Sequence, residues 1–250
     1  GISTLDLVLI QRHILGLEIF DNDRKYIAAD INNNNKITAS DLVELRKLIL
    51  GIANKFTNNN SWKFCTHLPA FNPSSKIEVD ESYKIIAGLN DVTKLNFKGI
   101  KIGDINNDSY IKNEVEPRKY KFATLNYSID NSYENEYILK FFNTTNTSLY
   151  GFQLSLNMVD FDILNIKSDQ ILIDLDHLFI NDDLLNISYS SPNTFIPDPS
   201  IPIFSVILKS KNNKGVFKGL NPMFKNEIYY SDMEVRKINL INSTYLKDID

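Results

Sequence analysis

The chain has one cysteine, Cys65, among its 250 residues, so no disulfide can form within it. It has no basic excess either: 27 Lys and Arg stand against 31 Asp and Glu, giving a net charge of −4. A nucleic-acid partner is therefore not expected, because the chain has no excess of basic residues to neutralise phosphates. No apolar run approaches the roughly 18 residues that a membrane-spanning helix needs. The longest candidate, Ile201–Leu208, is interrupted by Pro202 and Ser205.

Motifs for catalysis are also lacking. The sequence contains no Gly-rich phosphate loop and no Gly-x-Ser-x-Gly elbow. Cys65 and His67 would share one face of a strand, but no third group that could activate a thiol lies nearby in sequence. We expect no enzymatic activity. The chain opens on Gly1 without a secretory signal, so we expect it to be a piece of a longer protein.

The first fifty residues contain an internal repeat. Ile2–Val8 aligns with Ile37–Val43, and Ile14–Gly16 aligns with Ile49–Gly51, both at an offset of 35 residues. Apolar residues recur along one stripe of each copy, which predicts two amphipathic helices. The glycine after each helix predicts a left-handed C-terminal residue. Residues 21–29 are predicted to connect this pseudo-symmetric pair.

The start of the second copy has the pattern of an EF-hand calcium loop. Such loops supply oxygen ligands from positions 1, 3, 5, 7, 9 and 12. Here these positions are Asp30, Asn32, Asn34, Lys36 through its carbonyl, Thr38 through water, and Asp41. Position 6 is Asn35 in place of glycine, and asparagine tolerates the left-handed conformation best among the other residues. The sequence therefore predicts calcium as the cofactor. With only two carboxylates, we expect weak binding, near 10⁻⁴ to 10⁻³ M.

The first copy of this loop is incomplete. Its positions 7, 9 and 12 are Gly1, Ser3 and Asp6. A later acidic segment has the spacing of positions 1, 3 and 5, at Asp104, Asn106 and Asp108. This segment has three interpretations: a calcium site of its own, a metal-free turn because position 12 would be Val115, or the missing half of the first loop. The sequence alone ranks the last interpretation below the other two.

The remaining chain predicts β-structure. Residues 57–117 have strand signals at Trp62–Phe64 and Leu95–Ile102, which indicate a small β-rich extension ending in the acidic segment. Later strands are predicted at Phe122–Ser128, Tyr137–Phe142, Gly151–Met158, Ile163–Lys167, Leu185–Tyr189, Ile203–Lys209 and Glu234–Leu240. Short alternating strands at this spacing are typical of a β-sandwich. We therefore predict a multidomain α + β chain: a helical calcium module at 1–56, the extension at 57–117, and an antiparallel β-sandwich at 118–250.

Two segments carry a family resemblance. Leu7–Leu17 followed by Ala29–Leu42 resembles a type I dockerin module, which holds two calcium loop-helix repeats and binds cohesin domains. Ser61–Phe64 and Phe97–Asn106 are similar to the stretch that follows dockerin-like modules in large secreted Bacteroidetes proteins, which are generally exported by type IX secretion. In cellulosomal dockerins, loop positions 10 and 11 are a hydroxylated pair that helps choose the cohesin. Here they are Thr4-Leu5 and Ala39-Ser40, a departure that disfavours a standard cellulosomal cohesin.

The C-terminal part resembles a cohesin-type β-sandwich in the strands Tyr150–Leu156 and Ile203–Lys209. The two resemblances together imply a non-catalytic, calcium-binding structural or adhesive protein at the cell surface. Its partner would be a protein: a copy of itself or the rest of a longer chain. The alternative is a carbohydrate-binding accessory module of a secreted glycan-degrading enzyme. For this alternative we expect Tyr127, Tyr229 and Tyr230 to be exposed.

Overall fold

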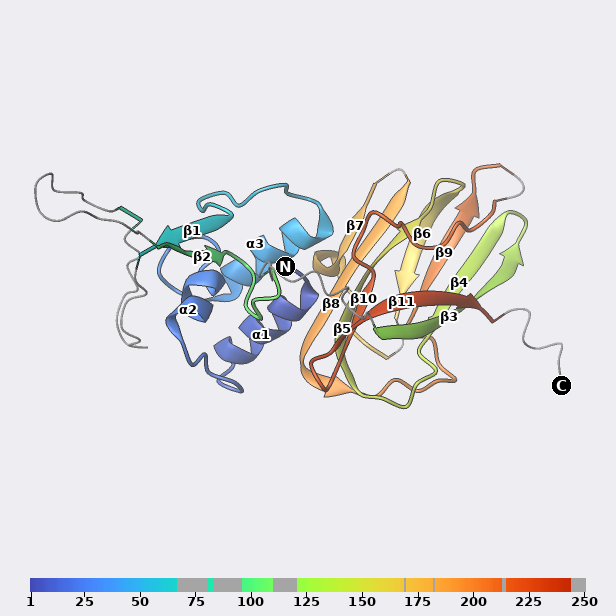
Figure 1. Cartoon of the computed structure of the whole chain (residues 1–250). Helices are drawn as coiled ribbons and strands as arrows, with labels where there is room; N and C mark the ends of the chain where they lie inside the picture. The colour runs from blue at the N-terminus through green and yellow to red at the C-terminus, as the bar shows by residue number, and fades with distance from the viewer. Residues whose placement is uncertain are drawn as a thin grey trace, which may run out of the picture. The chain divides into compact units, whose positions relative to one another are not determined.

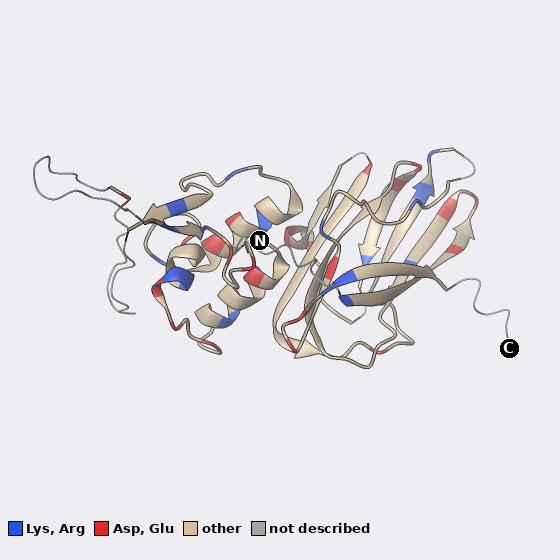
Figure 2. Ribbon diagram, in the orientation of Figure 1, with Lys and Arg blue, Asp and Glu red and all other residues tan. Residues whose placement is uncertain are grey.

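The computed structural model describes residues 1–66, 81–82, 96–109, 121–168, 170–181, 183–212 and 215–243. The chain divides into two compact units, Gly1–Val115 and Glu116–Asp250 (Figure 1). Acidic and basic residues are interspersed along both units (Figure 2). No helix in the described ranges is long and apolar enough to cross a membrane. His67 and Val115, which entered the sequence analysis, lie outside the described residues.

The first unit contains three helices, α1 (Thr4–Ile14), α2 (Asp23–Ala29) and α3 (Ala39–Leu50). Helices α1 and α3 are the repeated pair. Each begins at a capping box, Ser3 with Asp6 in α1 and Thr38 with Asp41 in α3, which satisfies backbone N–H groups of the first turn. The predicted left-handed glycine after α3 is confirmed, because Gly51 has a φ of 81°.

Helix α2 lies in the segment that was predicted only as a connection. Its seven residues are too short to show a helical period in the sequence. The side chain of Asn22 caps its N-terminus by accepting the N–H of Lys25 at 3.1 Å. The buried residues Ile27, Ala28 and Ala29 anchor the helix in the core of the unit.

The β-rich extension adds a two-stranded antiparallel sheet, β1 (Trp62–Cys65) and β2 (Lys98–Lys101). The N–H of Gly103 donates to the carbonyl of Ala28 at 2.7 Å, which attaches the end of this sheet to α2. Gly103 has a φ of 84°, and a Cβ there would lie 2.8 Å from Leu45 Cδ1, so glycine is required for this close approach. Cys65, Ile100, Ile102 and Ile105 share one buried cluster with the helices.

The second unit is a β-domain. Its elements are β3 (Lys121–Tyr133), β4 (Glu136–Phe142), β5 (Leu149–Asn157), β6 (Phe161–Lys167), the 3₁₀ turn η1 (Leu175–His177), β7 (Leu178–Ile180), β8 (Leu184–Phe195), β9 (Phe204–Ser210), β10 (Glu227–Tyr230) and β11 (Val235–Asn242). All seven predicted strands are present. The short strands β7 and β10 were not predicted, because three or four residues are too few for a visible alternation.

The nine strands form one hydrogen-bonded sheet in the order β6-β9-β4-β3-β11-β10-β5-β8-β7. The prediction of an antiparallel sandwich is therefore confirmed only in part. The last strand pairs in parallel with the first, from Arg236 opposite Lys121 to Asn242 opposite Tyr127. A parallel pair requires a long connection, and here the whole domain lies between the two strands.

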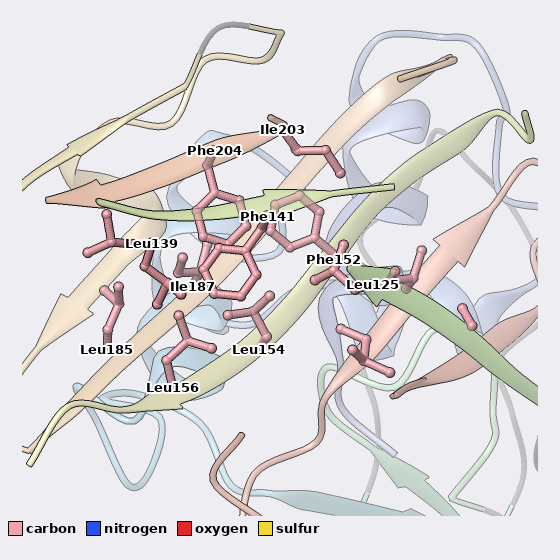
Figure 3. Close-up of a cluster of buried hydrophobic side chains, with 14 of the residues drawn as sticks. Leu125, Leu139, Phe141, Phe152, Leu154, Leu156, Leu185, Ile187, Ile203 and Phe204 are labelled. Atoms are coloured by element: carbon pink, nitrogen blue, oxygen red, sulfur yellow. The ribbon is translucent and has the colours of Figure 1, made fainter. Parts of the chain in front are cut away.

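The sheet curls around a single apolar core. Phe204 of β9 stacks on Phe141 of β4 with ring centroids 4.5 Å apart, and on Phe152 of β5 at 5.7 Å (Figure 3). Strands β9 and β5 are separated by four other strands in the sheet order. Their side chains can meet only because the sheet folds back on itself. Leu154 and Leu156 of β5 and Ile187 of β8 extend this core.

The expected exposure of the tyrosine pair in β10 is wrong. Tyr229 and Tyr230 are 0% and 1% exposed. Tyr230 belongs to the core cluster, and the Tyr229 hydroxyl donates to Glu227 at 2.9 Å. Strand β10 lies inside the sheet, between β5 and β11, and two adjacent tyrosines in a sequence do not reveal that position. Tyr127 is half-buried against the same core.

Candidate functional site

The contiguous loop, Asp30–Asp41, closes around the carboxylate that follows α2. The backbone N–H groups of Asn34 and Asn35 donate to the two carboxylate oxygens of Asp30, each at 2.9 Å. The N–H of Lys36 donates to Oδ1 of Asn34 at 2.8 Å. These contacts turn the backbone back on itself, so that the side-chain oxygens at positions 1, 3 and 5 converge.

Asp41 fastens the other end of the contiguous loop. This residue is fully buried at the start of α3. Its Oδ1 accepts the N–H of Ile31 at 2.9 Å, and its Oδ2 accepts the N–H of Thr38 at 2.9 Å. One carboxylate therefore joins the first residues of the loop to its last turn. The same carboxylate therefore caps α3 and occupies position 12 of the loop.

Two asparagines supply the left-handed conformations that the contiguous loop needs. Asn33 has a φ of 59° and Asn35 a φ of 62°. The predicted replacement of glycine by Asn35 at position 6 is therefore confirmed in conformation. The extension braces this loop from outside: Asn59 Nδ2 donates to the Asp30 carbonyl at 2.9 Å, and Lys63 Nζ donates to Asn33 Oδ1 at 2.7 Å.

The structure brings the two incomplete half-loops together. The N–H of Ile105 donates to Oδ1 of Asp6 at 2.7 Å, although these residues are 99 positions apart in the chain. Asp104 accepts the N–H groups of Asp108 and Ser109, at 3.2 and 3.0 Å. We call the combination of Asp104–Ser109 with Gly1–Asp6 the split loop. Sequence alone ranked this arrangement last.

The split loop repeats the hydrogen bonds of the contiguous loop position by position. Position 5 donates to positions 1 and 3 in both, from Asn34 and from Asp108. Position 12 accepts from positions 2, 3 and 9 in both, at Asp41 and at Asp6. Position 7 contacts the side-chain oxygen of position 5 in both: Lys36 N–H to Asn34, and the Gly1 nitrogen to Asp108. Asn107 has a φ of 60°, matching Asn33 at position 4.

Carboxylates in both loops are held out of water. Burial raises the pKa of Asp30 above its usual range, the charge of Asp41 adds to this, and the N–H groups of Asn35 and Asn34 act in the opposite direction. Burial also raises the pKa of Asp6 to about 7; the N–H of Ile105 opposes this, and the charge of Asp104 adds to it. Both loops thus concentrate negative charge that a cation would stabilise.

Arg24 of α2 holds the split loop through its backbone and not through its carboxylates. The guanidinium donates to the carbonyl of Asp104 at 2.9 Å and to the carbonyl of Ile105. Burial lowers the pKa of Arg24, while the charges of Asp104 and Asp6 raise it. Besides backbone N–H groups, the carboxylates of this loop are contacted by the Ser3 hydroxyl, at Asp6, and by the Gly1 nitrogen, at Asp108.

The donor set fits calcium better than other metals. Carboxylate, carboxamide, hydroxyl and carbonyl oxygens are the hard ligands that calcium takes in sixes to eights. In the described part of the chain, no three His, Cys, Asp or Glu side chains are grouped so as to hold a metal by themselves. Asn32, Asn34 and Asn106 and backbone carbonyls must therefore complete either loop. Bound calcium would neutralise the carboxylates and cross-link the two ends of each loop.

The remaining polar candidates have structural explanations. His13 accepts the N–H of Phe20 at Nδ1, 3.1 Å away, and stacks on the Phe20 ring at 4.0 Å. His177 contacts Asp174 within the 3₁₀ turn at 2.6 Å. Cys65 is buried, and burial raises its pKa, which is the opposite of what an activated thiol needs. None of these three side chains belongs to either calcium-type loop.

Comparison with known proteins finds a family that resembles part of the first unit. Residues 1–50 match the family model described as the Dockerin type I domain. Domains of this family bind calcium, are not catalytic, and dock to cohesin partners, typically in extracellular or cell-surface proteins. The match covers 50 of the 250 residues and ends before the extension and the β-domain. No curated protein sequence matches the chain.

Solved structures give only distant similarities. Two are forms of the GH20 exo-β-N-acetylglucosaminidase of Vibrio harveyi: an inactive mutant with a TM-score of 0.29, and a complex with N-acetylglucosamine at 0.28. Each is 11% identical, and each match covers 47% of this chain and 18% of the other. This chain thus matches less than a fifth of those enzymes. Similarity at this level bears on neither fold nor function.

Proposed function

We propose that the first unit is a calcium-stabilised docking module that attaches this chain to a protein partner outside the cell. The observation that carries the proposal is the contiguous loop, in which Asp30 and Asp41 gather the backbone of both loop ends around converging oxygens. The loop lies inside the segment that matches the dockerin family model. The attachment function follows from that family, and cohesin-type domains are the partners it implies.

Calcium has a structural role in this proposal. The contiguous loop has carboxylates only at Asp30 and Asp41, and a low charge count favours affinities of about 10⁻⁴ to 10⁻³ M, typical of extracellular modules. Such a site is filled in a calcium-rich exterior. It would hold α3 against the loop that precedes it, so that the docking surface keeps one shape.

Exposed apolar side chains of the first unit offer a contact surface. They lie after α1 and on or after α3: Leu15, Leu17, Ile19, Val43 and Ile52. At loop positions 10 and 11, Ala39 and Ser40 are exposed, and Ser40 Oγ is bonded to Asn32 Nδ2 at 2.8 Å. With alanine at position 10 and its serine engaged by the loop, a partner of non-cellulosomal type is favoured.

The second unit is proposed as a cohesin-like domain that also makes protein contacts. Two features support this: the resemblance of β5 and β9 to cohesin strands, and a curled sheet whose first and last strands pair. A chain that carries both kinds of unit can associate with further copies of itself. Location at the cell surface, and export by type IX secretion, follow from the resemblance.

Titration of the whole chain with calcium chloride, followed by calorimetry, tests the metal half of the proposal. The Asp41→Ala variant is expected to lose binding at the contiguous loop. Asp162→Ala, which removes an exposed carboxylate from β6, is the matched control and is expected to bind as the unchanged chain does. Calcium binding that survives Asp41→Ala without change would overturn the assignment of this loop.

The docking half is tested with immobilised cohesin domains of type I and with light scattering of the chain alone, each with calcium and with EDTA. Calcium-dependent binding to a cohesin, or calcium-dependent self-association, is the expected result. Binding on a glycan array without either of these would instead favour the carbohydrate-binding alternative. That alternative has lost its expected surface at Tyr229 and Tyr230, which are buried.

A further inference from the structure

Two carboxylates of the split loop are buried next to each other. Asp6 is 0% and Asp104 is 1% exposed, and their like charges interact. Removing an ionised carboxylate from water is costly unless a charge partner or a metal compensates. Arg24, whose charge interacts with both carboxylates, donates its hydrogen bonds to backbone carbonyls. The Gly1 ammonium contacts Asp108, but no ion pair to Asp6 or Asp104 is found among the described residues.

The two loops share residue types at four ligand positions as well as the hydrogen-bond pattern. In both, position 1 is aspartate, position 3 is asparagine, position 9 has a hydroxyl and position 12 is a buried aspartate. In the split loop the two halves occur in reverse order along the chain. Positions 1 to 6 are Asp104–Ser109, and positions 7 to 12 are Gly1–Asp6. Only the first of these halves lies outside the segment matched to the dockerin family.

We propose that Asp104–Ser109 and Gly1–Asp6 form one calcium site, in which Asp104, Asn106, Asp108, the Gly1 carbonyl, Ser3 and Asp6 take the ligand positions. This inference rests on calcium binding by the module but not on its docking role. The metal would join the start of α1 to the segment after β2. The calcium module then extends to residue 109, well past the segment that resembles a dockerin.

The same comparison ranks the two sites by affinity. The loops differ in charge at position 5, which is Asp108 in the split loop and Asn34 in the contiguous loop. The split loop thus has carboxylates at three ligand positions, Asp104, Asp108 and Asp6, against two in the contiguous loop, although these three side chains are not grouped as a metal cluster in this structure. Because calcium affinity rises with the number of charged ligands, the split loop is the tighter site.

A reciprocal pair of variants tests the site and its rank. Asp108→Asn gives the split loop the position 5 of the contiguous loop, and Asn34→Asp does the converse. Both changes keep the shape of the side chain, so both variants are expected to fold. Calorimetry of the full chain with calcium chloride should give two ions per chain. Asp108→Asn should weaken the tighter site by about three- to tenfold, and Asn34→Asp should strengthen the weaker site by a similar factor.

Two further measurements separate the split loop from the other interpretations. Asp6→Asn should weaken the same site that Asp108→Asn weakens; if it does not, residues 104–109 bind calcium by themselves and the proposal is wrong. Hydrogen exchange at the amides of Ile105 and Asn106, which donate to Asp6, should slow when calcium replaces EDTA. If the exchange is unchanged and the chain binds only one ion, which Asp41→Ala removes, the split loop is refuted and the contiguous loop stands. Conversely, if the chain binds only one ion and Asp41→Ala does not affect it, the contiguous loop is refuted and the split loop stands.

Discussion

The two units of this chain bury different kinds of polar group. Every carboxylate that the described residues bury lies in the first unit, at Asp6, Asp23, Asp41 and Asp104. The buried polar residues of the second unit are all neutral: Asn143, Gln153, Ser155, Asn186, Ser188, Ser190, Ser205 and Ser210. Neutral groups are satisfied by hydrogen bonds alone, whereas buried carboxylates need compensating charge. We therefore expect the stability of the first unit to depend on a bound cation and that of the second on its apolar core.

The core of the second unit should dominate its stability. Replacing Phe204 by alanine removes the ring that contacts both Phe141 and Phe152 and leaves a cavity. We expect a loss of about 3–5 kcal/mol in the free energy of unfolding of this unit. The loss should be the same with calcium and with EDTA, measured by far-UV circular dichroism in denaturant. Phe122→Ala, at an exposed position of β3, is the control and should cost within about 0.5 kcal/mol. A calcium-dependent effect of Phe204→Ala would break the contrast between the units.

Removal of calcium should act on the first unit only. At free calcium of about 100 times the dissociation constant, each filled site adds about 2.7 kcal/mol to stability. Trp62 is the only tryptophan of the chain and lies in the first unit, so its fluorescence reports that unit separately. EDTA should lower the unfolding temperature seen by Trp62 and leave the dichroism of the β-domain unchanged. Equal shifts in both signals would show that the units do not differ in this way.

A backbone substitution distinguishes metal-dependent from metal-independent stability within the first unit. Gly51 ends α3 with a φ of 81°, so Gly51→Ala should cost about 1 kcal/mol. Gly51→Asn should cost less, because asparagine tolerates this conformation. Both losses, followed by Trp62 fluorescence, should be equal with calcium and with EDTA, since Gly51 lies at the far end of α3 from the loop. A loss seen only in EDTA would mean that calcium reaches the whole helix.

Protonation of His13 should give the smallest effect. Burial lowers the pKa of His13 below its usual 6.5, so the folded state binds a proton less readily than the unfolded state. The first unit should therefore lose stability as the pH falls below 6.5 and through the folded-state pKa, because the imidazolium can no longer accept the Phe20 N–H. His13→Asn keeps an acceptor and should remove this part of the pH dependence at saturating calcium. An unchanged pH profile in that variant would assign the effect to other groups.

Local features were predictable from the sequence. The repeat, the left-handed conformations of Gly51 and Asn35, and seven strands all follow from spacing and residue type within short windows. Helix α2 and strands β7 and β10 escaped prediction because they are too short to carry a period. Tyr229 and Tyr230 escaped it because β10 lies inside the sheet beside β5, a strand that is distant in sequence.

The sequence by itself predicted one complete loop, Asp30–Asp41, and showed the spacing of positions 1, 3 and 5 at Asp104–Asp108, whose pairing with Gly1–Asp6 was the lowest-ranked of three interpretations. Only the tertiary structure decided that those halves meet, that β11 closes the sheet beside β3, and that Phe152 reaches Phe204 across a curled sheet. The physical reason is common to all three. A ligand spacing or an alternation is set by neighbouring residues, whereas a contact between residues 52 to 115 positions apart depends on how the packed cores bring distant segments together.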